Sequence, residues 1–363
     1  MNSPEIADQI RNQHRPLPRY EGPQAWYGPD MALRRDEWLR AWTGPELAEI
    51  EAAVARVLER DLEILEIGRE QFPLPTLEPV LHDIRKQVLH GRGFVLLRGL
   101  PVEHWSVRQA AIAYWGIGVH LGEACSQNAQ GHVLGHVKDL GRDYHDLLAR
   151  GYQTNARLPY HTDSTDIVGL LCWRPGKAGG LSSIVSSTTV YNEMAARRPD
   201  LAQVLLSAFH RTRWGEVAEG RSPWSEMPIF MPNDSRMIVS YVRSAITKGQ
   251  KLPGVPRLTE RQVEALDMMD ALAEDPQLYL DMEFMSGDIQ LLCNHSILHS
   301  RTAFEDWPEP DRRRHLLRLW LSCADGPALP EAIMRRDQDQ SASGRPSGIR
   351  LPGVALKAPL EAE

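Results

Sequence analysis

Residues 158–166 read Leu158-Pro159-Tyr160-His161-Thr162-Asp163-Ser164-Thr165-Asp166 and carry an imidazole and a carboxylate two positions apart. Side chains alternate along an extended strand, so His161 and Asp163 point to the same side of the backbone. Two such groups can occupy neighbouring corners of one metal's coordination sphere. With a histidine from elsewhere they would form the set of two histidines and one carboxylate that suits non-haem Fe(II) oxygenases. A His-x-Asp pair alone recurs by chance in many chains, so the rest of the sequence has to supply the support.

Composition and charge restrict the class of protein. The chain has 363 residues, 42% of them hydrophobic, and a formal net charge of −7, which argues against a general nucleic-acid binder. Apolar runs such as residues 93–97 are too short to span a bilayer, and residues 1–15 lack the apolar core of a signal peptide. We therefore expect a cytoplasmic protein without a membrane segment. The four cysteines have no paired spacing and are expected to be small core side chains: Cys125, Cys172, Cys293 and Cys323.

The order of elements predicts one main domain. We expect an N-terminal arm over residues 1–45 packed on the core, a single catalytic domain over 46–325, and a mobile C-terminal tail over 326–363. Apolar residues at helical spacing predict helices over 44–72, 77–90, 107–121, 188–197, 201–210 and 258–274. Short bounded apolar runs predict strands over 93–99, 132–137, 167–173 and 181–186, with further strands in 213–244 and 279–322. Many short strands with interspersed helices predict an α+β fold, a β-barrel or sandwich with helical buttresses.

The stretch from residue 122 to residue 159 is polar and irregular, and it directly precedes the candidate metal ligands. Such a loop is where a substrate pocket would be built, although a solvated connection is the plainer alternative. The candidate pocket residues are Gln127, Asn128, Arg157 and Tyr160, with Arg318 from the late strand. They favour a polar, anionic small molecule such as an amino acid or a derivative of one.

A late strand supplies the remaining charges. Arg314 and Arg318 lie four residues apart and so face one side of it, together with Leu316 and Trp320. Two guanidinium groups directed at one interior require anions, and a bidentate carboxylate is their natural partner. The combination of a metal triad and inward arginines indicates a small dicarboxylate bound beside iron.

Four ordered motifs, spread over about residues 90–322, carry a family resemblance. They are His161-Thr-Asp163, Gly179-Gly180-x-Ser182, Asn294-x-x-x-x-His299 and Arg314-x-x-x-Arg318. Together they resemble the taurine dioxygenase and clavaminate synthase superfamily, which are Fe(II)- and 2-oxoglutarate-dependent oxygenases on a double-stranded β-helix, or jelly-roll. The resemblance implies that core with flanking helices, Fe(II) as the metal, and 2-oxoglutarate and O2 as cosubstrates.

The same resemblance implies roles for individual residues. His161, Asp163 and His299 would bind iron, and Arg314 would bind the distal carboxylate of 2-oxoglutarate. Arg318 would be a second anchor for cosubstrate or substrate. Ser182 falls where taurine dioxygenase has a threonine that helps to hold 2-oxoglutarate, and a serine keeps the hydroxyl group.

Other residues compete for these roles. His295 could replace His299 as the third ligand but matches no position of the family. Asp166 could replace Asp163, but its spacing from His161 puts it on the opposite strand face, where it would cap or hydrogen-bond a turn. His132 and His136 lie in a glycine-flanked, β-prone segment and are expected to be ordinary polar residues.

The implied reaction is oxidation of an unactivated C–H bond, coupled to decarboxylation of 2-oxoglutarate to succinate and CO2. Hydroxylation is the default outcome, and desaturation and cyclisation are variants of it. The competing functions are a zinc-dependent hydrolase or isomerase on the same three ligands, and a non-catalytic binding protein on the same scaffold. Inward arginines argue against the hydrolase, and an intact triad argues against the binding protein. The sequence predicts a small-molecule partner, and it does not indicate the oligomeric state.

Overall fold

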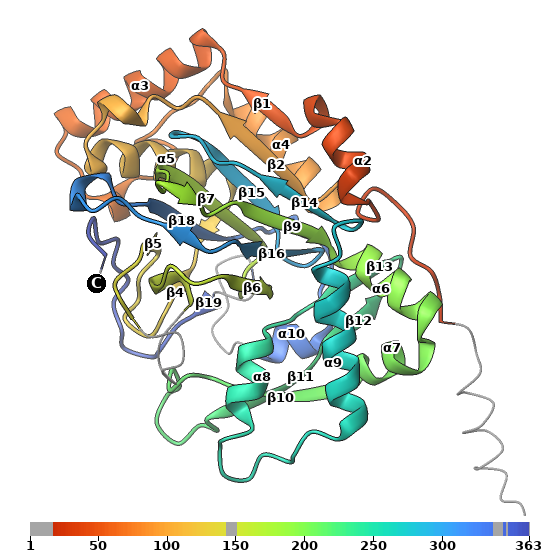
Figure 1. The fold of residues 1–363 in the computed structure, drawn as a ribbon. Helices are drawn as coiled ribbons and strands as arrows, with labels where there is room; N and C mark the ends of the chain where they lie inside the picture. Colours follow the sequence, from red (N-terminus) through yellow and green to blue (C-terminus); the bar gives the residue numbers. More distant parts are fainter. Residues whose placement is uncertain (1–16, 143–150, 337–343, 346–347, 363) are drawn as a thin grey trace, which may run out of the picture.

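Two β-sheets face each other in the computed structural model, which describes residues 17–142, 151–336, 344–345 and 348–362 (Figure 1). The larger sheet contains, in spatial order, β1 (Leu39–Ala41), β2 (Phe94–Arg98), β15 (Ile289–Cys293), β7 (Ile167–Arg174), β18 (His315–Ser322) and β3 (Glu123–Ala124), with β5 (Leu134–Val137) also on β18. The smaller sheet contains β14 (Tyr279–Met282), β9 (Ser182–Ser186), β16 (Ile297–Arg301) and β6 (Leu158–His161).

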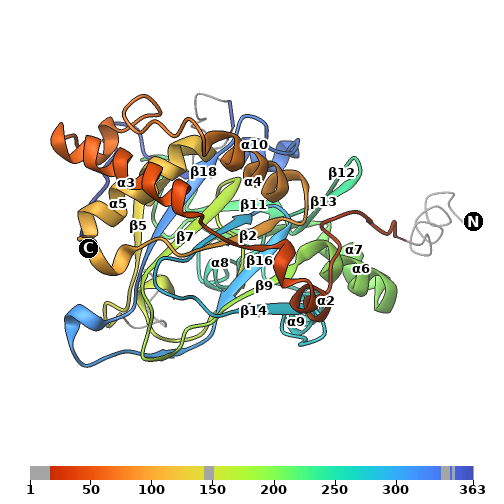
Figure 2. The ribbon, with the colours of Figure 1, turned by 90° about the horizontal axis from the view of Figure 1, so that it is seen from above.

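Helices cover the outer faces of both sheets (Figures 1 and 2). The helices on the larger sheet are α3 (Gly44–Glu59), α4 (Glu78–His90) and α5 (Val107–Leu121), and those beside the smaller sheet are α2 (Gly28–Leu33), α6 (Ser187–Arg197), α7 (Pro199–Leu205) and α9 (Glu260–Ala273). The helices α8 (Arg243–Gly249) and α10 (Glu331–Arg336) contact the segment of residues 208–228 instead. Four two-stranded ribbons complete the described fold: β10 (Ala208–Thr212) with β11 (Trp224–Pro228), β12 (Phe230–Asn233) with β13 (Arg236–Val239), β8 (Ala178–Gly179) with β17 (Phe304–Glu305), and β4 (Ser126–Gln127) with β19 (Gly348–Ile349). None of the helices in the described part of the chain has the length and apolar character needed to cross a membrane.

Because side chains alternate along each strand, the two faces of a sheet belong to separate hydrophobic cores. On β18, Leu317 and Leu319 pack outward against α3–α5, whereas Leu316 and Trp320 point between the sheets. A third core lies between the smaller sheet and the group α6, α7 and α9. This arrangement, with apolar contacts on both faces of each sheet, confirms the expected α+β fold with a jelly-roll core and flanking helices.

Two of the predicted helices have different bounds in the structure. The helix expected over 44–72 begins with a capping box between Thr43 and Glu46 but ends at Glu59, because Asp61 adopts a left-handed backbone with φ of 48°. The helix expected over 201–210 ends at Leu205, and residues from Ala208 onward form β10 because they pair with β11. Sheet pairing there overrides the local helical spacing.

Both terminal segments contribute to the core in their described parts. The expected N-terminal arm supplies β1, which extends the larger sheet, and buries Trp26 and Trp38 against Phe94. The expected C-terminal tail supplies β19, which pairs with β4, and buries Arg345 beside Asp166. The mobility expected for residues 326–363 stays a prediction, because most of the polar stretch over 337–346 lies outside the described residues.

Candidate metal centre

The register between β6 and β16 brings the two candidate histidines together. His161 lies directly opposite His299 in this antiparallel pair, and their ring centroids are 4.2 Å apart. Asp163 follows two residues after His161, where β6 has ended. Nε2 of His161 is 3.9 Å from Oδ1 of Asp163, and Nε2 of His299 is 3.8 Å from Oδ2. Among the described residues these three form a group whose possible ligand atoms all lie within 4.8 Å of one another.

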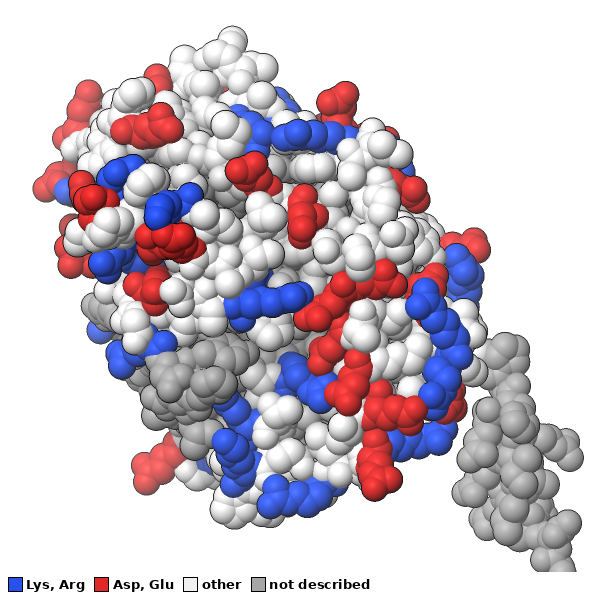
Figure 3. All heavy atoms as spheres, in the orientation of Figure 1, with Lys and Arg blue, Asp and Glu red and all other residues white. Residues whose placement is uncertain are grey.

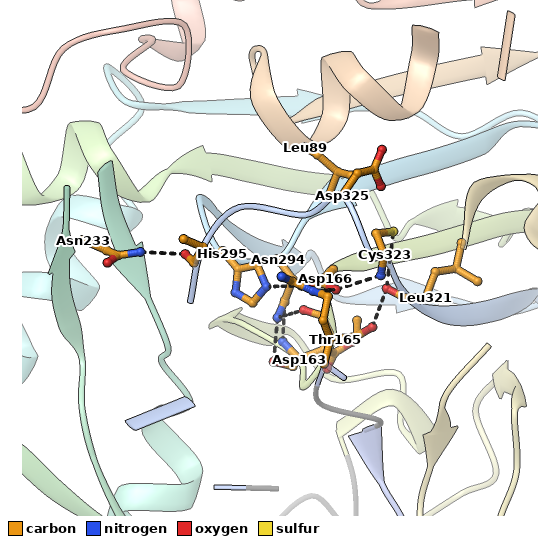
Figure 4. Close-up of polar contacts among 12 residues, drawn as sticks. Leu89, Asp163, Thr165, Asp166, Asn233, Asn294, His295, Leu321, Cys323 and Asp325 are labelled. Atoms are coloured by element: carbon orange, nitrogen blue, oxygen red, sulfur yellow. Dashed lines mark hydrogen bonds and ion pairs between the residues drawn. The ribbon is translucent and has the colours of Figure 1, made fainter. Parts of the chain in front are cut away.

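The backbone around Asp163 is held by a side chain from the other predicted motif (Figure 4). Asn294 accepts a hydrogen bond from the Asp163 backbone N–H at 2.7 Å and donates to the carbonyls of Asp163 and Thr165 at 2.7 and 3.0 Å. The amide thus replaces a strand partner just where the ladder of β6 stops. The His-x-Asp and Asn-x-x-x-x-His motifs therefore build one structural unit.

The carboxylate of Asp163 also has fixed partners. Oδ2 accepts a hydrogen bond of 2.8 Å from Nε1 of Trp320 and one of 3.3 Å from Arg318. Arg318 in turn donates to Oε1 of Gln127 at 2.7 Å. Trp320 and Arg318 come from the inner face of β18, so a single strand orients this carboxylate.

Burial and charge keep the three groups in the forms that bind metals. Burial lowers the pKa of both imidazoles, and the pKa of His299 falls to about 3, with His161 as a further cause. Burial would raise the pKa of the Asp163 carboxyl, but Arg318 and the two histidines outweigh it and hold this pKa below its usual range. Neutral imidazoles and an ionised carboxylate are the donor set of a divalent transition metal, so these residues fit Fe(II) and also fit Zn²⁺.

A second pair of charges faces the same interior. Arg314 and Arg301 are 4% and 5% exposed, and both border a small cavity of about 40 Å³ that also contacts His161 and His299. Both guanidinium groups contact Phe304, whose ring centroid is 4.7 Å from Cζ of Arg301 and 5.0 Å from Cζ of Arg314. Among the described residues, neither guanidinium has a carboxylate partner. Arg301 donates to the backbone carbonyl of Ala156, but its Nε and Nη1 of Arg314 have no hydrogen-bond partner.

Burial without an anion destabilises the charged form of both arginines. It lowers the pKa of Arg314 to about 10 and, together with the nearby Arg314, lowers the pKa of Arg301 to about 9. Each charge would regain stability from a bound anion. The cavity is therefore a place where a carboxylate is the missing partner.

The remaining predicted pocket residues divide into two groups. Ser182 borders the small cavity and donates to Gln290 at 3.0 Å, and Gln127 and Tyr160 border an adjoining cavity of about 130 Å³. Asn128 hydrogen-bonds within its own loop, to the backbone N–H groups of Gln130 and His132. Arg157 forms a half-exposed ion pair with Glu274. Asn128 and Arg157 thus lie outside the two cavities beside the metal centre.

The alternative ligands lie in a separate network. Nε2 of His295 is 2.8 Å from Oδ1 of Asp166, which also accepts a hydrogen bond from the backbone N–H of Cys323 (Figure 4). Asp166 also binds Arg345. Nδ1 of His136, on β5, is 2.7 Å from Nε2 of His315, on β18. None of these groups contributes to the three-residue cluster.

Two residues of the site were not predicted from the sequence. Arg301 follows His299 by two positions and therefore shares its strand face, a signal that period-two spacing does contain. Trp320 was placed on the inner face of β18, but its hydrogen bond to Asp163 depends on how the two sheets approach each other. No spacing rule within one strand contains that information.

Comparisons with known proteins agree with this geometry. A sequence model described as "Taurine catabolism dioxygenase TauD, TfdA family" matches residues 58–320. FR-33289 synthase of Streptomyces rubellomurinus is 30% identical over 315 residues, which cover 86% of this chain and 93% of that protein. Taurine hydroxylase-like protein SAT17 of Stachybotrys chartarum is 31% identical over 308 residues, which cover 81% of this chain and 77% of that protein.

A solved structure extends the likeness to the fold. Asparagine oxygenase, crystallised with Fe(II), 2S,3S-3-hydroxyasparagine and succinate, superposes with a TM-score of 0.64 at 16% identity. The superposition covers 86% of this chain and 99% of that one. The family match spans well over half of the sequence and includes all four motifs, so this chain belongs to the TauD/TfdA family and is a dioxygenase.

Proposed function

We propose that His161, Asp163 and His299 hold Fe(II), and that Arg314, with Arg301 and Ser182, holds 2-oxoglutarate. In this proposal the enzyme uses them to oxidise a C–H bond of a polar small molecule. The observation that carries the proposal is the pair of buried guanidinium groups, without a carboxylate partner among the described residues, in one cavity with the two histidines. A hydrolase with the same metal ligands would not require two buried arginines that bind a dicarboxylate.

The iron, with O2 and 2-oxoglutarate, would supply the oxidising power: one oxygen atom goes to succinate as CO2 is released, and the other goes to the substrate. The protein's own groups orient the metal ligands and exclude bulk water. The hydrogen bond between Nδ1 of His161 and the carbonyl of Pro159, at 2.8 Å, directs Nε2 toward the centre. Trp320, Arg318 and Asn294 fix the carboxylate, and apolar residues between the sheets keep bulk water away.

The guanidinium of Arg314 would meet the distal carboxylate of 2-oxoglutarate, and Arg301 would contribute a second positive charge to the same cavity. Arg318 borders both cavities, so the resemblance's role for it as a second anchor for cosubstrate or substrate stays a prediction, and its contacts with Asp163 and Gln127 support a further role. It would orient the metal ligand and border the substrate cavity of about 130 Å³. Asparagine is the substrate named for one solved relative, and an amino acid or a derivative is the class that we propose here.

The test is formation of succinate from 2-oxoglutarate in the presence of Fe(II), ascorbate and O2, with Arg314→Ala as the informative variant. Arg312→Ala is the matched control, because Arg312 is exposed and stacks on Trp307 at the surface. We expect succinate from the wild type and the control, and a large loss in Arg314→Ala. Hydrolytic turnover that requires Zn²⁺ and ignores 2-oxoglutarate would favour the hydrolase instead.

A further inference from the structure

A larger cavity lies on the other side of the Asp163 segment. Its volume is about 290 Å³, and its walls come from the connection between β10 and β11 and from residues 348–352, with Thr162, Asp163 and Ser164 at one end. It shares Asp163, Trp214 and Ile349 with the cavity of about 130 Å³ that contacts the metal centre. The two spaces therefore meet at the candidate metal ligand, although the mechanism above uses only the smaller one.

The lining of this cavity is strongly basic in an acidic protein. Four arginines border it, against the carboxylates of Asp163 and Glu216: Arg211, Arg213, Arg221 and Arg350. The chain as a whole has a net charge of −7. Figure 3 shows acidic side chains gathered over α9 and basic side chains on the adjoining lower part of the same face. A concave wall of one sign concentrates a ligand of the opposite sign.

The arginines are arranged by depth. Arg211 is 6% exposed and is fixed by hydrogen bonds to the hydroxyl and carbonyl of Ser240, at 2.9 and 2.7 Å. Arg213 is half-buried, and Arg221 and Arg350 lie at the exposed rim. An inner guanidinium held in place, with more exposed guanidinium groups around it, suits a small anion that enters from the rim.

Trp214 lies where the two cavities meet. It is one of three described non-glycine residues with a left-handed backbone, with φ of 51°, and its backbone N–H donates to the Thr212 hydroxyl at 3.1 Å. Backbone conformations of this kind persist only where surrounding contacts hold them. The indole lines both spaces and can pack on the body of a molecule that extends from one to the other.

We propose that the cavity of about 290 Å³ binds a phosphoryl-type dianion, a phosphate monoester or a phosphonate, carried by the prime substrate. A carboxylate has two oxygens and one charge, which one or two arginines satisfy. A tetrahedral dianion has three terminal oxygens and two charges, which suit a wall that carries several guanidinium groups. The proposal rests on the proposed function, since it directs the oxidised carbon toward Asp163 while the anionic end stays among the arginines.

The experiment is isothermal titration calorimetry of the anaerobic Fe(II)- and 2-oxoglutarate-loaded protein with methylphosphonate, and separately with acetate. Wild-type protein should bind methylphosphonate at least about 10-fold more tightly than acetate. Arg213→Gln and Arg350→Gln should each weaken methylphosphonate about 3- to 10-fold, and the double variant about 10- to 100-fold, on the scale of lost charge-assisted hydrogen bonds. Arg56→Gln is the control, because Arg56 is exposed on α3, away from the cavity.

Equal affinity for methylphosphonate and acetate would overturn the proposal, and so would an equal loss of affinity in Arg56→Gln, since that would show a diffuse surface charge effect. The visible absorption band of the Fe(II)–2-oxoglutarate complex is recorded first for every variant. If that band fails to form in the wild type, the proposed function fails. The same titration of the metal-free full chain then still tests the arginine site by itself.

Discussion

The buried charges of the site differ in what each already contacts, and this difference decides what each substitution should do. Arg301, Arg314 and Arg318 border one cavity, but Arg318 is paired with Asp163, whereas the other two have no carboxylate partner among the described residues. Spacing along β18 treats Arg314 and Arg318 as equivalent, since both face inward. Their contacts divide them into a candidate cosubstrate anchor and a group that orients a metal ligand.

Arg314→Ala should weaken 2-oxoglutarate binding by roughly 30- to 3,000-fold, because a buried guanidinium–carboxylate pair is worth about 2–5 kcal/mol when one partner is removed. Arg314→Lys should restore only part of the affinity, since an ammonium lacks the planar fork. Titration of 2-oxoglutarate into anaerobic Fe(II) protein measures both. A variant Arg318→Ala that loses more 2-oxoglutarate affinity than Arg314→Ala would reverse the assignment.

Trp320→Phe should lower Fe(II) affinity by about 10- to 100-fold, the usual effect of removing a hydrogen bond that orients a metal ligand. The substitution keeps an aromatic ring between the sheets but removes the 2.8 Å bond to Asp163. Trp42→Phe is the matched control, because Trp42 is also buried and its Nε1 has no hydrogen-bond partner among the described residues. Equal Fe(II) affinity in both variants would show that Trp320 serves packing alone.

At the scale of elements, the strand register places the site residues opposite one another, and a glycine turn leaves space for the side chain of Arg314. Ser182 on β9 lies opposite Arg301 on β16, and His299 on β16 lies opposite His161 on β6. The Gly179-Gly180 motif precedes β9, and both residues are left-handed, with φ of 72° and 71°. A Cβ at position 180 would lie 3.0 Å from Nε of Arg314 and 3.3 Å from Cβ of Phe304. The turn therefore makes space for the arginine.

Gly180→Ala should destabilise the fold and weaken 2-oxoglutarate binding together, because it adds a contact with Arg314 to a left-handed backbone that costs about 1–2 kcal/mol for a residue with Cβ. Gly254→Ala separates these effects: Gly254 has φ of 79° with open space around its missing Cβ. Denaturant unfolding and 2-oxoglutarate titration of both variants check this. Unchanged 2-oxoglutarate affinity in Gly180→Ala would mean that the turn does not position Arg314.

At the scale of the whole molecule, the C-terminal segment contacts the core next to the metal centre through Arg345. Arg345 forms a doubly hydrogen-bonded ion pair with Asp166, which is 2% exposed and also binds His295. His295 and Asn294 are neighbours, and Asn294 holds the Asp163 segment. Arg345 thus stabilises, through Asp166 and His295, the segment next to Asn294, which holds the backbone of Asp163.

Stability in acid should depend on this ion pair. Burial raises the pKa of Asp166, but Arg345 and His295 outweigh it and lower the pKa from 3.8 to about 2. The folded form therefore binds the proton less readily than the unfolded chain, so a stabilisation of about 2 kcal/mol is complete above pH 4 and is lost as pH falls through 2.

Arg345→Ala should cost roughly 3 kcal/mol near pH 7, because it leaves a buried carboxylate without its main partner, and the difference from wild type should narrow as pH falls toward 2. Urea unfolding at several pH values measures this. Arg108→Ala, which removes an exposed pair with Asp61, should change stability little at any pH. A difference between Arg345→Ala and wild type that does not vary with pH would exclude the carboxylate as its cause.

Much of the fold and the site could be predicted from single-strand patterns. Period-two alternation placed Arg314, Leu316, Arg318 and Trp320 on one face, and the cavities and core contacts agree with that. The four motifs identified the family. Features that depend on contacts between distant segments were beyond such patterns: the strand at Ala208, the Trp320–Asp163 bond and the Arg345–Asp166 pair. These arise from how the sheets and the C-terminal segment approach each other in three dimensions.

The most direct test of the account is the anaerobic titration of Fe(II) and 2-oxoglutarate into wild type, His299→Ala and His295→Gln, followed by the visible band of the complex. Glutamine at position 295 keeps a donor for Asp166. We predict that the band forms in the wild type and in His295→Gln and is lost in His299→Ala while the protein stays folded. A band that persists in His299→Ala, or that disappears only in His295→Gln, would contradict the assignment of His161, Asp163 and His299 as the metal centre.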